Sequence, residues 1–515
     1  MLQDPVRERP TTRPPEPADP PATRAPGWET AALVLAVVIT VLAWVPFLEH
    51  PLGSDESGFL LLAQHWSHGT SLYGDYWVDR PPLLLWLFDL ADHAGPTSTA
   101  TVGVVAPAVK ILGALASGLA VLLTGLLARR VAPTTRWARV GAIVVATALL
   151  CSPLLGMPET DGEVLAVPLV LLGLLLLIGS ALRPWGSRAL LLTVGAGAAA
   201  TSAALVKQNV VDVFVFALVA LLVAHRQVER PAARAAAFTS GAVGTLAVAM
   251  VAAAAQGTSP AGVWNAIVVF RFHATAVIGS SASSATPERM HSLIEAFLAS
   301  GAAAVLVMTA VLALREAVRR TQPLAVPALV LVAWELVGVA CGGSYWLHYL
   351  TGLVPGLVLL VAIARASRRW VTLLFTGVVS YVVLAAAVVW IDVANTPVGE
   401  TSDAQVESYL RAHAEPSDGV VVGFGHPGIV AGSGLSSPYE HLWSLPVRVN
   451  DPRLTELQRV LSGPDAPDWV VTAGSALDTW GLDAESADHY LAEHYVREAI
   501  FGDWYVWHRF DEGPR

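Results

Sequence analysis

Long runs of apolar residues alternate with short polar stretches through most of this 515-residue chain. A helix that crosses a membrane needs about 20 mostly apolar residues. The pattern therefore predicts an all-α polytopic membrane protein with about eleven transmembrane helices. They are expected at residues 29–48, 100–128, 138–156, 163–182, 189–206, 209–225, 235–255, 291–314, 324–341, 350–366 and 371–391.

Arginine residues gather in every second connection between these segments. They are Arg129, Arg130, Arg136, Arg139, Arg183, Arg188, Arg226, Arg230, Arg234, Arg315, Arg319, Arg320, Arg365, Arg368 and Arg369. Loops rich in Lys and Arg stay on the cytoplasmic side. The alternation predicts a cytoplasmic N-terminus and a C-terminus outside, and it agrees with the number of helices.

The two ends of the chain differ from the apolar middle. Residues 1–27 are rich in Pro and charged residues, a composition that predicts a disordered cytoplasmic tail. Residues 28–391 form the transmembrane domain. Residues 392–515 are expected to fold as a small α/β domain outside the membrane, with helices at 403–412 and 484–494, strands at 419–424 and 469–472, and a hairpin at 496–509 that turns at Gly502-Asp503.

The first outer loop, residues 49–99, carries most of the unusual polar residues. Asp55 and Glu56 follow the first apolar segment, and Asp79-Arg80-Pro81-Pro82 comes about 25 residues later. Two short apolar stretches, 57–68 and 82–91, predict helices lying in the membrane interface. Proline is tolerated in the first turn of a helix, so the Pro pair marks the start of the second.

The overall composition excludes an ordinary soluble domain. Hydrophobic residues make up 54% of the chain and charged residues 14%, and the mean hydropathy is +0.56. The formal charge of −10 argues against a nucleic-acid partner. With only Cys151 and Cys341, disulfides cannot be the main support of an exported domain.

Asp55 and Glu56 are the first candidates for chemistry. A partly desolvated carboxylate can act as a general base toward a hydroxyl, and a second carboxylate can hold a metal or orient an acceptor. The pair could equally be charges that favour the first turn of a helix, capped by Ser54.

Cations on the predicted outer face could bind an anion. Arg80 could pair with a phosphate or could point toward lipid headgroups. Lys207 lies between two apolar segments, where an ammonium is costly without water, a partner or an anion. Other polar residues of this face are open to a functional or an ordinary surface role: Tyr73, Asp79, Glu159, Asp161, Arg271, His273, His348 and Tyr349. No nucleotide-binding motif or zinc-type spacing is present.

Several short motifs together resemble one family. They are the outer Asp55-Glu56, the aromatic stretch after it, Asp79-Arg80-Pro81-Pro82-Leu83 leading to Trp86, Leu205-Val206-Lys207-Gln208, and His348-Tyr349 before Pro355. Residues 29–391 resemble the family 39 type of GT-C glycosyltransferases, which includes protein O-mannosyltransferases and bacterial aminoarabinose transferases.

The resemblance implies an integral enzyme of a bacterial-type plasma membrane that moves a sugar from a polyprenyl-monophosphate donor to a hydroxyl of a glycan, lipid or protein acceptor. It implies that Asp55 is the catalytic carboxylate, with Glu56 beside it, and that Arg80 stands by the donor phosphate, where the family usually has Lys. Lys207, Arg271, His348 and Tyr349 are expected on the donor side. Tyr73, Asp79, Glu159, Asp161 and His273 are expected near the substrate.

Three questions stay open at this level. A divalent metal bridging Glu56 or Glu159 with the phosphate is compatible with the sequence but not required by it. A lipid or glycan transporter would carry ionisable residues inside its spanning helices and show repeated halves. A non-catalytic envelope protein would bind glycan through its C-terminal domain.

Overall fold

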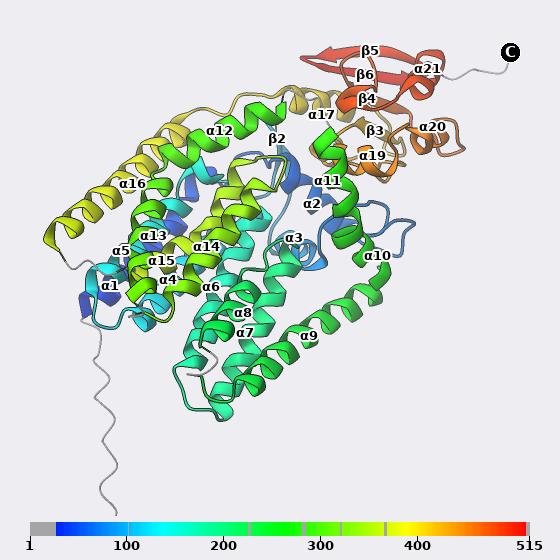
Figure 1. The fold of residues 1–515 in the computed structure, drawn as a ribbon. Coiled ribbons are helices and arrows are strands. Elements are labelled where there is room, and N and C mark those ends of the chain that lie inside the picture. The colour runs from blue at the N-terminus through cyan, green and yellow to red at the C-terminus, as the bar shows by residue number, and fades with distance from the viewer. Residues whose placement is uncertain are drawn as a thin grey trace, which may run out of the picture.

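The computed structural model describes residues 27–510, apart from residue 101 and residues 225–227, 281–284, 320–321 and 365–367. The predicted N-terminal tail lies outside the described residues, as do Arg226, Arg320 and Arg365 of the predicted cytoplasmic loops. Most of the described chain is a helical bundle, with a small mixed sheet at one end (Figure 1).

Each of the eleven apolar segments predicted from the sequence contains at least one helix. The helices of the bundle are α1 (Gly27–Leu42), η1 (Val45–Phe47), α4 (Pro107–Val131), α5 (Arg136–Leu150), η2 (Pro153–Leu155), α6 (Gly162–Ala181), α7 (Ser187–Val206), α8 (Asp212–Ala224), α9 (Pro231–Ala255), α10 (Pro260–Trp264), η3 (Asn265–Val269), α11 (Phe270–Ser280), α12 (Ala285–Ala299), α13 (Ala302–Arg319), α14 (Ala325–Ala340), η4 (Leu347–Leu353), α15 (Val354–Ile363) and α16 (Arg369–Asn395).

Seven helical segments in the described chain are long and apolar enough to cross a membrane, and a bent pair would make eight. They are Gly27–Phe47, Pro107–Val131, Gly162–Ala181, Ser187–Val206, Pro231–Ala255, Pro260–Gly279 and Arg369–Asn395. Large apolar side chains on α9 and α16 are exposed, among them Val248, Val251 and Leu384. Such a surface is stable against lipid and would be unstable against water.

Two stretches differ from the expected helix pattern. The segment predicted as one span at 291–314 is two helices, α12 and α13, which meet at an angle of 63°. Gly301 lies at the break with a φ of 78°, a left-handed conformation that glycine adopts without strain. Residues 256–290 lie between two predicted spans and were expected to form an outer loop, but the described part of this region is largely helical. Pro260–Gly279 includes the π-helical turn η3.

The arginine-rich helix ends lie together on one side of the bundle. Arg139 at the start of α5 pairs with Glu29 at the start of α1, at 2.9 Å. Arg234 at the start of α9 donates to the carbonyl oxygens of Ser180 and Arg183, at the end of α6. The start of α5 thus meets the start of α1, and the start of α9 meets the end of α6.

The first loop contains the two predicted helices, α2 (Ser54–Gln64) and α3 (Pro82–Ala94), and a hairpin of β1 (Ser98–Ala100) and β2 (Gly103–Val105). Helix α3 begins at Pro82 because Pro81 has an extended backbone, with φ −71° and ψ 156°. Helix α2 is not an exposed surface helix. Its residues from Glu56 to Ala63 are all buried, and it packs between α3 and α18 (Pro427–Ser433).

The C-terminal region matches the elements predicted from its sequence. Its sheet has the order β3-β4-β6-β5, with β3 (Val420–Gly423) parallel to β4 (Trp469–Ala473) and the other pairs antiparallel. Strands β5 (Tyr495–Phe501) and β6 (Trp504–Arg509) form the hairpin that turns at Gly502-Asp503. The remaining elements are α17 (Ser402–His413), α18, α19 (Ser444–Asn450), α20 (Thr455–Leu461), η5 (Thr479–Gly481) and α21 (Glu485–His494).

One hydrophobic core joins the first loop to the C-terminal region. Phe59 and Tyr76 of the loop belong to the same buried cluster as Val422, Ile429 and Trp469. A second cluster, which includes Val421, Val470 and Leu457, lies on the other side of the sheet. The sheet therefore packs against the loop that carries Asp55 and Arg80. Cys151 and Cys341 are both free thiols.

Candidate functional site: a carboxylate beside paired guanidinium groups

Asp55 lies in the first turn of α2, where a carboxylate is favoured by the helix dipole. Gly53, in an extended conformation, precedes the helix, and its N–H donates to the Glu56 carboxylate at 2.8 Å. The Asp55 side chain is 38% exposed, and its Oδ2 lies 3.9 Å from Nη2 of Arg80. Its Oδ1 accepts a hydrogen bond of 2.9 Å from the indole of Trp443.

Asp79 is a buried carboxylate that holds two guanidinium groups. Arg80 Nη1 donates to Asp79 Oδ1 at 2.6 Å. Arg271 Nη2 of α11 lies 2.5 Å from Asp79 Oδ2, an ion pair that lacks the in-line geometry of a hydrogen bond. Asp79 alone cannot neutralise two cations, and Asp55, 3.9 Å from Arg80, is a second and more distant counter-charge. The two guanidinium groups still have unused N–H donors for an anion.

Two further contacts fix the backbone of this group. The buried Tyr73 hydroxyl donates to the Arg80 carbonyl at 2.6 Å, and Gln208 Nε2 donates to the Asp79 carbonyl at 2.8 Å. Burial opposes the charge of Arg80, but Asp79 and Asp55 outweigh it and hold the pKa of this guanidinium above its ordinary value. Arg80 is therefore a permanent cation in a fixed position.

The charges of Arg80 and Arg271 act on the Tyr349 hydroxyl, and the Tyr349 ring lies beside a third cation, Lys207. The Lys207 ammonium, at the end of α7, lies 4.7 Å from the centre of the Tyr349 ring and pairs with Glu163 in the first turn of α6. The Glu163 Oε2 atom is buried without a hydrogen-bond partner and lies 4.0 Å from His348 Nε2. The cationic cluster thus continues into an acidic one.

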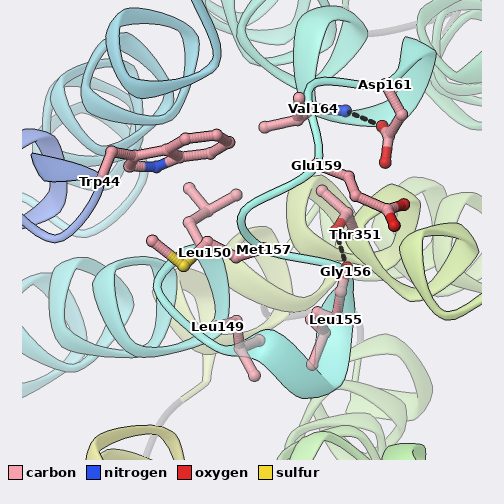
Figure 2. Close-up of a pocket in the computed structure, with 10 residues that line it drawn as sticks. All are labelled: Trp44, Leu149, Leu150, Leu155, Gly156, Met157, Glu159, Asp161, Val164 and Thr351. Atoms are coloured by element: carbon pink, nitrogen blue, oxygen red, sulfur yellow. Dashed lines mark hydrogen bonds between the residues drawn. The ribbon is translucent and has the colours of Figure 1, made fainter. Parts of the chain in front are cut away.

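The acidic cluster consists of Glu159, Asp161 and His348. His348 Nδ1 lies 3.4 Å from Glu159 Oε2 and 3.4 Å from Asp161 Oδ2. Glu159 and Asp161 also line a small pocket, whose other walls include Trp44, Leu150 and Met157 (Figure 2). Asp161 Oδ1 accepts from the Val164 N–H and so caps α6, while Oδ2 faces His348.

The donor atoms of this cluster suit a divalent cation. One atom from each of Glu159, Asp161 and His348 lies within 4.8 Å of the others. Burial raises the pKa of Asp161 to about 7, although His348 opposes the rise, and a bound cation would favour the charged carboxylate. Two carboxylate oxygens and an imidazole nitrogen, with the unpartnered Glu163 oxygen nearby, fit an ion such as Mn²⁺ or Zn²⁺.

Glu56 lies beside this cluster but is held by other partners. Its oxygens accept from Lys110 Nζ at 2.6 and 2.8 Å, from the Thr160 N–H at 2.7 Å and from the Gly53 N–H. Both Glu56 and Lys110 are 2% exposed. With these acceptor sites occupied, Glu56 ties α2 to α4 and to the segment before α6.

The structure brings together most of the residues selected from the sequence. Arg80, Asp79, Arg271, Tyr349, Lys207, Glu159, Asp161 and His348 form one continuous group next to Asp55. Tyr73 acts through the Arg80 backbone. Glu56 is enclosed by its partners, and His273 is exposed on α11, two residues beyond Arg271.

Three residues of the site were not selected from the sequence. Lys110 is a lone charge in the apolar stretch 107–128. Because burying an unpaired charge is costly, its position alone could have indicated a buried partner. In the sequence, Glu163 stands out only as part of the short acidic segment 159–163. Trp443 has no local signal, because its role depends on a contact with a residue 388 positions away.

The fold is shared with solved membrane glycosyltransferases. ArnT from Cupriavidus metallidurans bound to undecaprenyl phosphate superimposes with a TM-score of 0.60 at 15% identity, over 96% of this chain and 100% of that chain. The oligosaccharyltransferase of Archaeoglobus fulgidus gives 0.59 at 11% identity, over 91% and 72%. The same archaeal enzyme, AglB, in complex with an inhibitory peptide and a dolichol-phosphate, gives 0.54 at 13% identity, over 93% and 74%.

These likenesses assign the fold. The chain has the GT-C fold, an integral membrane architecture, as the short motifs indicate. The family 39 subtype stays a prediction. Comparison of the sequence with family models and with characterised proteins gives no match.

Proposed function

We propose that this protein transfers a sugar from a polyprenyl-monophosphate donor to an acceptor hydroxyl on the outer membrane face. The observation that carries the proposal is the position of Asp55 beside two guanidinium groups held by one buried carboxylate, Asp79. A base next to an anion site is what displacement of a lipid phosphate by a hydroxyl requires. The solved relatives hold undecaprenyl phosphate and dolichol-phosphate, which supports a donor of this class.

The reaction is assigned as a single in-line displacement that inverts the anomeric centre. Asp55 takes the proton of the acceptor hydroxyl as its oxygen bonds to the anomeric carbon. The bond from that carbon to the phosphate oxygen breaks, and the electron pair leaves with the phosphate. Arg80, Arg271 and Lys207 stabilise the charge of the departing lipid phosphate. Asp79 and Tyr73 hold Arg80 in place, and Glu56 has an architectural role.

The topology of the proposal follows from the arginine-rich helix ends. That side is assigned to the cytoplasm, which places the N-terminus inside, and the opposite end, with Asp55 and the C-terminal region, outside. The acceptor, a glycan, lipid or protein, then arrives from the outside, while the donor stays in the membrane. A bacterial-type plasma membrane provides both.

The purified protein in lipid nanodiscs tests the proposal directly. We expect it to bind a long-chain polyprenyl phosphate, tested with undecaprenyl and decaprenyl phosphate, to release this lipid from a radiolabelled polyprenyl-phosphate sugar in the presence of a suitable acceptor, and to form a product of inverted configuration. Failure to bind either lipid phosphate would contradict the donor class. Sugar transfer with retained configuration would contradict the single displacement.

Replacing Arg271 tests the phosphate-binding role of the cationic cluster. Arg271→Gln removes a charge-assisted contact of a kind that contributes about 1.5–3 kcal/mol, so the apparent affinity for decaprenyl phosphate should fall by about 10- to 100-fold. The side chain is 37% exposed, which makes misfolding a minor concern. Binding is measured by competition with a labelled lipid phosphate. Arg368→Gln, an exposed arginine outside the cluster, is the matched control, and equal affinities in the two variants would exclude the assigned role.

We further propose that Glu159, Asp161 and His348 hold a divalent cation. When bound, such an ion would supply positive charge to the phosphate oxygens. Equilibrium dialysis of the wild-type protein with Mn²⁺ should show one tight site, and Asp161→Asn should weaken it by at least about tenfold. Asp75→Asn, an exposed acid of the first loop, should leave binding unchanged. The same Mn²⁺ affinity in the wild type and Asp161→Asn would rule out this site.

A further inference from the structure

One indole group of the C-terminal region forms a hydrogen bond with the first turn of α2. Trp443, just before α19, donates its Nε1–H to Asp55 Oδ1 at 2.9 Å. The other oxygen, Oδ2, faces Arg80 at 3.9 Å. The two oxygens of the same carboxylate therefore have different partners, one from the C-terminal region and one from the proposed phosphate site.

The Trp443 ring is held tightly enough to define the direction of this hydrogen bond. It stacks on Phe59 of α2, with ring centres 5.8 Å apart and an angle of 29° between the planes. Gly58 lies against its edge, and a Cβ added there would be 2.4 Å from a carbon of the indole. Glycine at position 58 thus permits the close approach of the indole to α2.

A second contact holds the same helical turn. The Ser54 hydroxyl donates to the Gly425 carbonyl at 2.7 Å, so the residue before Asp55 is also tied to the C-terminal region. Further along the first loop, the Trp77 N–H donates to the Glu440 carbonyl at 3.0 Å. The first loop is therefore anchored to the C-terminal region at two places, the start of α2 and Trp77.

We propose that the C-terminal region is a working part of the catalytic site, and that Trp443 is the positioning residue for Asp55. The inference rests on the proposed glycosyl transfer. The indole occupies Oδ1 and stabilises the charged carboxylate, since a hydrogen bond donated to an anion favours it. Oδ2, which the indole does not occupy, is then the oxygen left to take the acceptor proton.

Replacing the indole with a phenyl ring tests this role. Trp443→Phe keeps an aromatic ring against Phe59 and removes the N–H donor. Without the indole the Asp55 carboxylate is no longer fixed toward the acceptor, and a misplacement of about 1 Å can cost about 100-fold, so kcat should fall by about 10- to 100-fold. KM for the donor should stay near the wild-type value, because the phosphate contacts are intact. A fall in kcat with an unchanged KM, at a thermal stability no lower than that of the control variant below, is a result that a purely structural role would not produce.

Trp504→Phe is the matched control. Trp504 makes the same kind of bond, from its indole to Asp403 Oδ1 at 2.8 Å, within the C-terminal region and away from α2. This variant should lose a similar amount of thermal stability while keeping the wild-type kcat and KM. The same fall in kcat in both variants would overturn the proposal, since it would point to a general loosening of the region.

The outcome can be separated from a failure of the proposed function. If Asp55→Asn is inactive while Trp443→Phe has the wild-type kcat and KM, Asp55 keeps its role and only the positioning role of Trp443 is refuted. If Asp55→Asn is fully active, the assignment of the base is wrong, and Trp443 has no catalytic carboxylate to position.

Discussion

Asp55→Asn should reduce sugar transfer by about 10²- to 10⁴-fold, the range that general-base catalysis contributes. The amide has nearly the same shape as the carboxylate and can still accept the Trp443 hydrogen bond. It cannot accept a proton from the acceptor hydroxyl. Binding of decaprenyl phosphate should be retained, because Arg80 and Arg271 remain paired with Asp79. Initial rates with a radiolabelled donor, together with a binding isotherm, measure both quantities.

Asp75→Asn provides the control for this change. Asp75 is an exposed carboxylate of the same loop, and its loss should leave the rate unchanged. An Asp55→Asn enzyme with more than about a tenth of wild-type activity would exclude Asp55 as the base, since it falls outside the expected range.

The second large effect is expected on stability, at the buried pair of Glu56 and Lys110. Lys110→Met leaves a carboxylate enclosed without its cation, and breaking a buried pair in this way costs about 3–5 kcal/mol. The double variant Glu56→Gln, Lys110→Met removes both charges and should recover much of that loss. Thermal unfolding in nanodiscs, followed by the near-ultraviolet signal of the Trp residues, compares the three proteins.

The same variants distinguish an architectural Glu56 from a catalytic one. If Glu56 only joins α2 to α4, the double variant should transfer sugar at a rate close to wild type once corrected for the folded fraction. A well-folded double variant with a loss of about 100-fold or more would assign Glu56 a part in the chemistry.

Local sequence patterns predicted those elements that are set by nearby residues. The apolar runs, the start of α3 at the Pro pair and the hairpin at Gly502-Asp503 each depend on a few neighbouring positions. The break between α12 and α13 was missed because the apolar character continues through Ser300 and Gly301. The helical stretch Pro260–Gly279 was missed because its polar residues at 271 and 273 weaken the apolar pattern.

The candidate site was predictable where its parts lie in one loop. Asp55, Asp79 and Arg80 are near each other in sequence, and their residue types indicate a base and an anion site. The enclosure of Glu56 could not be predicted, because it depends on Lys110 and on the backbone of Thr160. The contact of Asp55 with Trp443 depends on tertiary packing alone.

The core shared by the first loop and the C-terminal sheet has a consequence for synthesis of the chain. Phe59 and Tyr76 are translated early, whereas their partners in the same core, Val422 and Trp469, are translated much later. The 388 positions between Asp55 and Trp443 correspond to about 20 to 80 s at elongation rates of about 5–20 residues per second. During that time the loop has apolar side chains without their final cover and a carboxylate without its indole. A chain that stops before Trp443 cannot form this contact, so, on the proposed function, full activity is expected only after the C-terminal region has been synthesised.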